Sequence, residues 1–122
     1  MTIRHPSLAG RSILIVEDEP LIALEVHSAF SAAGARISSA SDAKEALRII
    51  NLPDLSAAVV DINLKDGDCS RVCQRLSERG IPFVFYTGDA RPDILLKWRD
   101  VPVLTKLADK ERIVQAVAGV LR

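Results

Sequence analysis

Four short apolar runs, each ending on polar or charged residues, constrain what this chain can fold into. The third is the simplest case, because residues 57–60 stop directly on Asp61 with no turn residue between them. An acid in that position often does no more than cap the next turn. The other three runs end in the same way, on Glu17 with Asp18, on Thr87, and on Thr105 with Lys106. This recurrence indicates that the polar groups meet in space.

Helical patterns alternate with the apolar runs. We expect strands at residues 12–16, 35–40, 56–61, 81–86 and 101–105. Apolar residues recur at helical spacing between them, as at Ile22, Val26 and Phe30. Helix starts are marked by Pro20, by Asp42 with Glu45 three residues later, by Pro92 and by Asp109. The alternation predicts an α/β fold, a doubly wound parallel sheet with helices on both faces.

Length and composition fit one small domain. The chain has 122 residues and a formal net charge of zero, which gives no reason to expect nucleic-acid or membrane partners. Residues 1–10 are expected to form a flexible lead-in and residues 11–122 the domain. No export signal or membrane-spanning run is recognisable, so a cytoplasmic location is expected. Cys69 and Cys73 share one helical face, which favours packing in the core over metal or redox work.

The polar residues after the strands suit metal-assisted chemistry. In parallel sheets ligands bind beyond the carboxyl ends of the strands, where Glu17, Asp18 and Asp61 are expected. Two carboxylates about 4 Å apart repel by roughly 4 kcal/mol at an effective dielectric of roughly 20. A fold that gathers three of them therefore needs a cation, and oxygen ligands favour a hard ion such as Mg²⁺.

Asp61 is the candidate nucleophile of this group. A carboxylate can accept a phosphoryl group, giving an aspartyl-phosphate. The transition state of that transfer spreads charge over the phosphoryl oxygens. A metal, the Lys106 ammonium and the Thr87 hydroxyl could each stabilise one of those oxygens. The residue types therefore match phosphoryl transfer to Asp61.

The chain resembles the receiver domains of response regulators, which act in two-component and phosphorelay signalling. The resemblance covers about residues 11–122. It is carried by ILIVEDE at 13–19, VVDINL at 59–64, FVFYTG at 83–88 and LTK at 104–106. It implies a flavodoxin-like, receiver-like (βα)5 fold with strand order 2-1-3-4-5.

The resemblance also implies roles for the site residues. Asp61 would be the phosphoacceptor. Glu17, Asp18, Asp61 and the backbone carbonyl of Asn63 would hold Mg²⁺. Thr87 would be the switch hydroxyl and Lys106 the cation that binds the phosphoryl group.

The sequence departs from the family pattern at several positions. Leu107 follows Lys106 where the family usually has Pro, which leaves the placement of the ammonium and the conformation of that peptide bond open. Val103 occupies the position of the usual switch aromatic. The segment ending in Tyr86-Thr87-Gly88 is similar to a receiver subgroup with a Phe-x-Thr-Gly signature that also lacks the aromatic switch.

These features lead to an expected function and two alternatives. We expect a single-domain response regulator that takes a phosphoryl group from a histidine kinase or histidine phosphotransfer protein. It would signal to a downstream protein by contact or serve as a phosphate sink, and it would not count as an enzyme. One alternative is a pseudo-receiver that binds partners without phosphorylation. The other is a phosphatase with an aspartate nucleophile, for which Asn63 stands where a second acid would be needed.

A partner surface is expected near the fourth helix. Leu96 and Trp98 lie in the segment that receivers commonly use for signalling. Packing in the core is an equally good account of Trp98, the only tryptophan of the chain.

Overall fold

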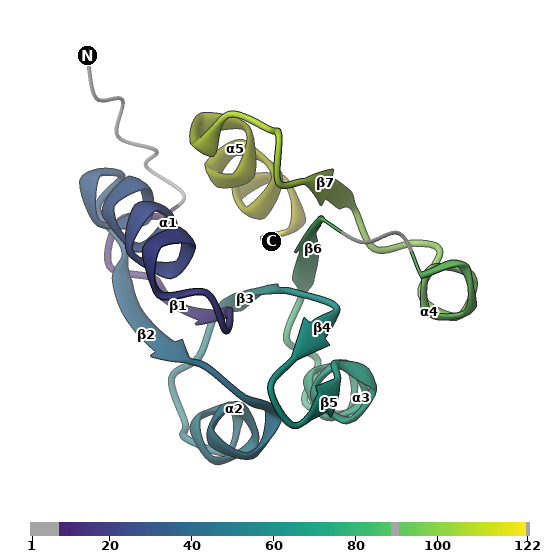
Figure 1. The fold of residues 1–122 in the computed structure, drawn as a ribbon. Coiled ribbons are helices and arrows are strands. Elements are labelled where there is room, and N and C mark those ends of the chain that lie inside the picture. Colours follow the sequence, from purple (N-terminus) through teal and green to yellow (C-terminus); the bar gives the residue numbers. More distant parts are fainter. Residues whose placement is uncertain (1–7, 89–90, 122) are drawn as a thin grey trace.

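The apolar runs form the strands of one parallel sheet in the computed structural model, which describes residues 8–88 and 91–121 (Figure 1). The strands in the described part are β1 Ser12–Val16, β2 Arg36–Ala40, β3 Ala57–Val60, β4 Asn63–Leu64, β5 Gly67–Asp68, β6 Phe83–Thr87 and β7 Val103–Thr105. The helices there are α1 Pro20–Ala32, α2 Ala43–Ile50, α3 Ser70–Glu78, α4 Pro92–Lys97 and α5 Lys110–Val120.

The strand order confirms the predicted topology. Within the described ranges the main sheet runs β2-β1-β3-β6-β7, which is the order 2-1-3-4-5 when only its own strands are numbered. Every pair in it is parallel. The register places Val16 of β1 beside both Ala40 of β2 and Val60 of β3. The residues that follow these three neighbouring strands therefore emerge side by side.

Helices cover both faces of the sheet, as expected. Figure 1 shows α1 and α5 on one face and α2, α3 and α4 on the other. Alternate strand residues point into the two layers, so that Phe85 packs toward α2 and α3 while Val84 packs toward α1 and α5. β3 and β6 are buried throughout, which explains their unbroken apolar sequences.

The helix ends follow the signals read from the sequence. α1 begins at Pro20, where the missing N–H leaves no hydrogen bond unmade. The Asp42 carboxylate accepts a hydrogen bond from the Glu45 N–H at 2.8 Å, and Asp109 caps α5 in a similar way through Glu111. Gly34 adopts a φ of +99° just after α1, a left-handed conformation that favours glycine.

A small hairpin between β3 and α3 was not predicted from the sequence. β4 and β5 pair antiparallel in it. Asp66 at its tip accepts hydrogen bonds from the Ala43 N–H at 2.9 Å and the Lys44 N–H at 3.2 Å. The hairpin therefore caps α2 from outside that helix.

The folded part begins before residue 11, where the sequence placed the start of the domain. Leu8 is fully buried and packs among the residues between the sheet, α1 and α5. The rest of the expected lead-in, residues 1–7, lies outside the described part. Cys69 and Cys73 are buried free thiols in the other layer, as predicted. In the described ranges, no helix is long and apolar enough to cross a membrane.

Candidate functional site

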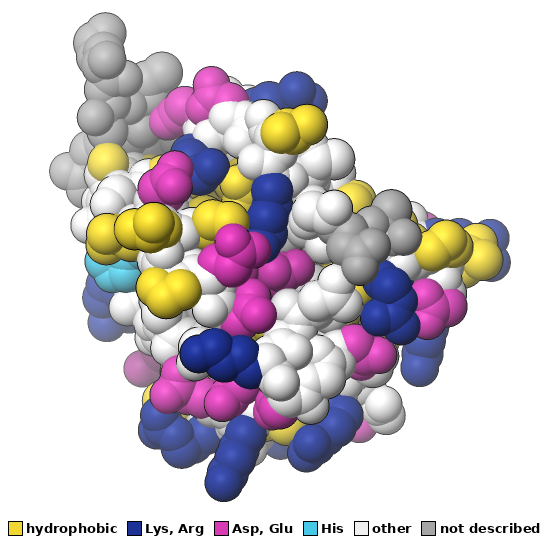
Figure 2. Space-filling model, viewed as in Figure 1, with side chains coloured by type: hydrophobic (Ala, Val, Ile, Leu, Met, Phe, Trp, Pro, Cys, Tyr) yellow, Lys and Arg dark blue, Asp and Glu magenta, His cyan; other side chains and the backbone are white. Residues whose placement is uncertain are grey.

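The acids predicted to meet do lie together at the carboxyl edge of the sheet. Glu17, Asp18, Glu19 and Asp61 each offer a carboxylate oxygen within 4.8 Å of the others. The parallel register brings them there, because Glu17 follows β1 and Asp61 follows the neighbouring β3. The Asp61 N–H donates to the Val16 carbonyl at 2.9 Å, which extends the pairing of the two strands. Acidic side chains gather near the middle of the face in Figure 2.

Lys106 reaches this group from the edge strand β7. Its N–H donates to the Thr87 carbonyl at 3.1 Å, which fixes the backbone beside β6. Its ammonium lies 2.9 Å from Asp61 Oδ2, 2.9 Å from Glu19 Oε1 and 3.0 Å from Glu17 Oε1. Only 16% of the Lys106 side chain is exposed. One cation thus pairs with acids that follow two different strands.

Burial and charge change the proton affinities in this metal-free arrangement. Burial raises the pKa of Glu17 to about 7, with a smaller contribution from the Asp61 charge, and the Lys106 hydrogen bond only partly opposes it. Burial alone would lower the pKa of Lys106. Hydrogen bonds to Glu19, Asp61 and Glu17 outweigh that effect and raise it. Lys106 therefore stays charged, while Glu17 is more easily protonated than an ordinary glutamate.

The donor set fits a hard divalent cation. Four carboxylates face a single ammonium, so the site carries excess negative charge even if Glu17 is protonated. Glu17 Oε1 is buried and accepts no hydrogen bond within the described ranges, although the ammonium lies 3.0 Å away. Carboxylate oxygens are the ligands that Mg²⁺ prefers. The site therefore has both the charge and the ligand type for this ion.

A pocket of about 240 Å³ opens beside the acids. It is lined by Asp18, Glu19, Asp61, Asn63, Thr87, Gly88 and Lys106. Of the residues predicted to bind the metal or the phosphoryl group, all except Glu17 line it. Glu17 is 4% exposed and lies behind Lys106, whose ammonium it binds. Thr87, the last residue of β6, is buried at the pocket wall.

The positions without the family's usual residues lie next to this pocket. Val103 is 46% exposed at the start of β7 and lines a neighbouring cavity together with Leu107. The peptide bond after Lys106 is trans. No aromatic ring stands at position 103, so the usual coupling of Thr87 to a switch aromatic cannot operate here.

The expected partner residues have different surroundings. Leu96 on α4 is 70% exposed. Trp98 is half-buried, packs against the core and meets Phe83 edge to face with ring centroids 5.7 Å apart. Packing therefore accounts for much of the Trp98 surface, and contact of either residue with a partner stays a prediction.

Three residues near the site were missed by the sequence analysis. Glu19 was not named as a site residue, although its place directly after Glu17 and Asp18 was a usable signal. Arg91 donates to the Asn63 side chain at 3.4 Å and also contacts Asp93 on α4. Tyr86 reaches the Lys106 carbonyl at 3.4 Å. No local pattern marks Arg91 or Tyr86, because both contacts are made by tertiary structure.

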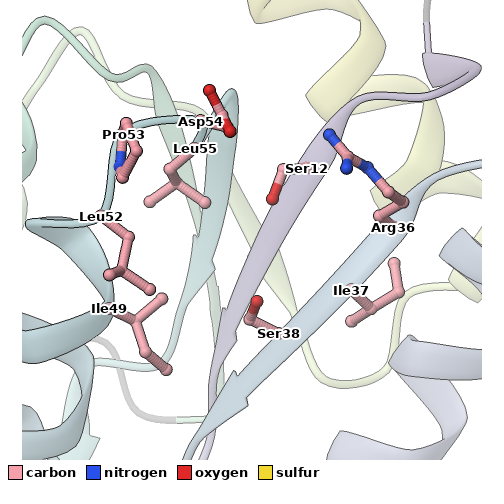
Figure 3. Close-up of a pocket in the computed structure, with 9 residues that line it drawn as sticks. All are labelled: Ser12, Arg36, Ile37, Ser38, Ile49, Leu52, Pro53, Asp54 and Leu55. Carbon is pink, nitrogen blue, oxygen red and sulfur yellow. The ribbon is translucent and has the colours of Figure 1, made fainter.

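Another cavity, of about 390 Å³, lies at the opposite edge of the sheet (Figure 3). Ser12 and Arg36, which line it, are the first residues of β1 and β2. Its other lining residues are Ile37, Ser38, Ile49, Leu52, Pro53, Asp54 and Leu55. The acids follow the last residues of their strands, so this cavity is separate from the candidate site.

Comparison with known proteins agrees with the fold and the acid cluster. Residues 13–118 match the response regulator receiver domain family. The solution structure of SdrG from Sphingomonas melonis Fr1 is 31% identical, with a TM-score of 0.76 over 93% of this chain and 98% of that one. A CheY-like receiver domain protein from Methanospirillum hungatei JF-1 has a TM-score of 0.81 at 20% identity, covering 91% and 93% of the chains. Among curated proteins, none matches the chain in sequence.

The fold and the carboxyl-edge site define a flavodoxin-like α/β protein with an acidic pocket at the carboxyl edge of its parallel sheet. The chain belongs to the response-regulator receiver domain family. Members of this family typically bind Mg²⁺ in an acidic pocket, and here a cluster of acids occupies the corresponding edge.

Proposed function

We propose that this protein accepts a phosphoryl group on Asp61 from the phosphohistidine of a histidine kinase or histidine phosphotransfer protein. The observation that carries the proposal is the position of the Asp61 carboxylate. It lies in a pocket wall 2.9 Å from the Lys106 ammonium, within a cluster of acids that suits Mg²⁺. Receiver domains in general exchange phosphoryl groups with such partners, which supports this choice of donor.

The proposed phosphoryl transfer needs only the Asp61 carboxylate, the phosphohistidine donor and the positive charges of the pocket. A carboxylate oxygen of Asp61 forms a bond to phosphorus while the P–N bond of the donor breaks. The electron pair of that bond stays on the imidazole nitrogen, so the histidine leaves neutral when its other nitrogen carries a proton. Lys106 is held at the pocket by Glu17 and Glu19 and supplies positive charge next to the incoming oxygens. Bound Mg²⁺ would neutralise further phosphoryl charge.

Each residue of the pocket then has a distinct task. Asp18 and Asp61, with the Asn63 carbonyl, would hold the ion, and Glu17 would contribute from behind the pocket. Thr87 would donate its hydroxyl to a phosphoryl oxygen from the end of β6. The reaction consumes one Asp61 per transfer, so we regard the protein as a phosphoacceptor and not as an enzyme.

A relative supports an activated state of this kind. A BeF₃-activated conformation of SdrG from Pseudomonas melonis Fr1 is 34% identical to this chain, with a TM-score of 0.76 over 93% of it and 98% of that chain. We infer that BeF₃⁻ will also occupy the pocket beside Asp61 here. Activation would then be recognised by a downstream protein, or the protein would only remove phosphoryl groups from the kinase.

The free thiols of Cys69 and Cys73 suit the reducing cytoplasm as the place of action.

Phosphorylation of the purified protein tests the proposal. With Mg²⁺ and a small phosphodonor such as acetyl phosphate, we expect a single acid-labile mass gain of one phosphoryl group. Asp61→Asn should abolish it, and Asp54→Asn, at an exposed aspartate in the opposite cavity, should not. EDTA should prevent the gain in the wild type.

Two other outcomes would replace the proposal. If the wild type gains no mass and a partner binds equally well to Asp61→Asn, the protein is a pseudo-receiver that works by contact alone. If it repeatedly hydrolyses a generic phosphoester, it is a phosphatase that uses Asp61 as nucleophile.

A further inference from the structure

Tyr86 is a buried aromatic residue that immediately precedes Thr87 at the pocket wall. It lies near the end of β6 and is 2% exposed. Its ring packs in the layer between the sheet, α1 and α5, together with Val84 and Ile113. A tyrosine buried in this way needs partners for its hydroxyl.

The Tyr86 hydroxyl has two such partners, and their chemistry decides in which hydrogen bond it donates and in which it accepts. The Lys110 ammonium lies 2.9 Å from the hydroxyl oxygen. An ammonium can only donate, so the hydroxyl accepts there and its own proton remains for another group. The hydroxyl donates that proton to the Lys106 backbone carbonyl in a long hydrogen bond of 3.4 Å.

These contacts hold the backbone of Lys106 on both sides. Its N–H donates to the Thr87 carbonyl at 3.1 Å, and its carbonyl accepts from Tyr86. The next residue, Leu107, is 97% exposed and packs against little that could hold the chain. Two consecutive residues of β6 therefore set the starting point from which the Lys106 side chain crosses to Asp61.

The same network extends to two helices, α5 and α1. Lys110 is the first residue of α5, and its ammonium lies 3.7 Å from Glu25 Oε2 on α1. The hydrogen bond to Tyr86 raises the pKa of Lys110, with a further contribution from the Glu25 charge, so the ammonium stays charged. Glu25, Lys110 and Tyr86 thus form a continuous polar path from the α1–α5 side of the molecule to Lys106.

We propose that the Tyr86 hydroxyl, acting from β6, is the positioning group of Lys106 in a chain where Leu107, and not a proline, follows that lysine. This inference rests on the proposed phosphorylation of Asp61. The hydrogen-bond partners of the Tyr86 hydroxyl are Lys106 and Lys110, so we expect its effect on Asp61 to act through Lys106.

Tyr86→Phe tests this directly, because it removes the hydroxyl and keeps the buried ring. We expect the rate of Asp61 phosphorylation by acetyl phosphate to fall roughly two- to tenfold, the factor that follows from losing one neutral hydrogen bond. Ser56→Ala is the matched control, since it removes a hydroxyl that accepts from the Ser12 N–H at 3.2 Å at the other edge of the sheet. Its phosphorylation rate should equal that of the wild type.

A double-mutant cycle separates positioning from general damage. In the Lys106→Ala background, Tyr86→Phe should cause no further loss of rate, because the group it positions is gone. The metal-free wild type and Tyr86→Phe should also differ in the NMR resonances of the Lys106 side chain. An equal loss of rate in both backgrounds, or unchanged Lys106 resonances together with a wild-type rate, would overturn the inference.

The two proposals fail in different ways. If the wild type is never phosphorylated, the proposed function is wrong, whatever Tyr86 does. The Lys106 resonances still report on the anchoring in that case, because they need neither phosphoryl transfer nor Mg²⁺.

Discussion

Lys106 illustrates how much of the site depends on single side chains. Its ammonium is the counter-charge for Asp61, Glu17 and Glu19. Two of those acids are almost completely buried, so their charge cannot be offset by water alone. The lysine therefore stabilises the metal-free fold, and we expect it to compete with a bound metal for the same oxygens.

Lys106→Ala should separate these two effects. We expect the metal-free variant to lose about 2 kcal/mol of unfolding free energy, less than for a fully buried ion pair because the pocket is open to solvent. Mg²⁺ should then stabilise the variant more than it stabilises the wild type, since the competing cation is gone. Urea unfolding with and without Mg²⁺ measures both quantities.

Lys44→Ala, at an exposed position on α2, is the control for removing a positive charge and should behave as the wild type. Equal Mg²⁺ stabilisation of Lys106→Ala and the wild type would contradict the competition between lysine and metal.

The two cysteines show the opposite case, in which reactive groups serve only packing. Their sulfur atoms lie 3.7 Å apart and both residues are fully buried. The hydrogen bond from Cys73 to Cys69, together with burial, raises the pKa of the Cys73 thiol, so the nucleophilic thiolate is disfavoured. A thiol reagent such as DTNB should react with neither cysteine in the folded protein and with both in denaturant. Rapid labelling under native conditions would disprove the packing role.

Among the elements, the β4–β5 hairpin links the acid-bearing loop after β3 to the start of α2. Asp66 makes this link by accepting from two N–H groups of the first turn of α2. Asp42 caps the third free N–H of the same turn. Two carboxylates, those of Asp42 and Asp66, thus lie at the positive end of α2. Only Asp42, which directly precedes the helix, could be recognised as its cap from the sequence.

The contribution of Asp66 should depend on pH. The hydrogen bond from the Ala43 N–H, helped by that from Lys44, lowers the pKa of Asp66 in the folded protein. An acid with a lowered folded pKa stabilises the protein above its unfolded pKa, and this contribution disappears as the pH falls through the folded value. Asp66→Asn should therefore be less stable than the wild type at neutral pH, and the difference should shrink in acid, below about pH 4.

Urea midpoints measured from pH 2 to 7 check this expectation. Asp54→Asn is the control, since the Asp54 carboxylate lies in the opposite cavity and not at the start of a helix. The difference in urea midpoint between this variant and the wild type should be the same at every pH. A constant difference for Asp66→Asn would mean that the carboxylate charge does not matter at the helix end.

For the molecule as a whole, periodicity was enough to predict an α/β fold with a parallel sheet. The strand order was implied by the family resemblance, and part of the site was missed. The buried strands could be recognised because their apolar runs are unbroken, and their polar ends located the acids at one edge. The β4–β5 hairpin escaped because two-residue strands leave no periodic pattern. Tyr86 was assigned to a strand like any other aromatic, because its hydrogen bond to Lys106 joins elements 20 residues apart in sequence.

The site also couples distant parts of the chain, so occupying it should stabilise the entire fold. Glu17 and Asp18 follow β1, Asp61 follows β3 and Lys106 follows β7, so a metal at the acids holds together loops from separate strands. A ligand that binds only the folded state adds about 2.7 kcal/mol of stability at one hundred times its dissociation constant. We expect Mg²⁺ to raise the urea midpoint accordingly, relative to NaCl of equal ionic strength.

Two variants make this expectation specific to the acid cluster. Asp18→Asn removes a predicted ligand and should abolish most of the Mg²⁺ effect, whereas Asp54→Asn should retain it. Hydrogen exchange should slow in the loops after β1 and β3 when Mg²⁺ is added, and it should be unchanged around Ser12 and Arg36 at the opposite edge. An equal shift of the urea midpoint by Mg²⁺ in both variants would place the ion elsewhere, because losing one carboxylate of this cluster must weaken binding there.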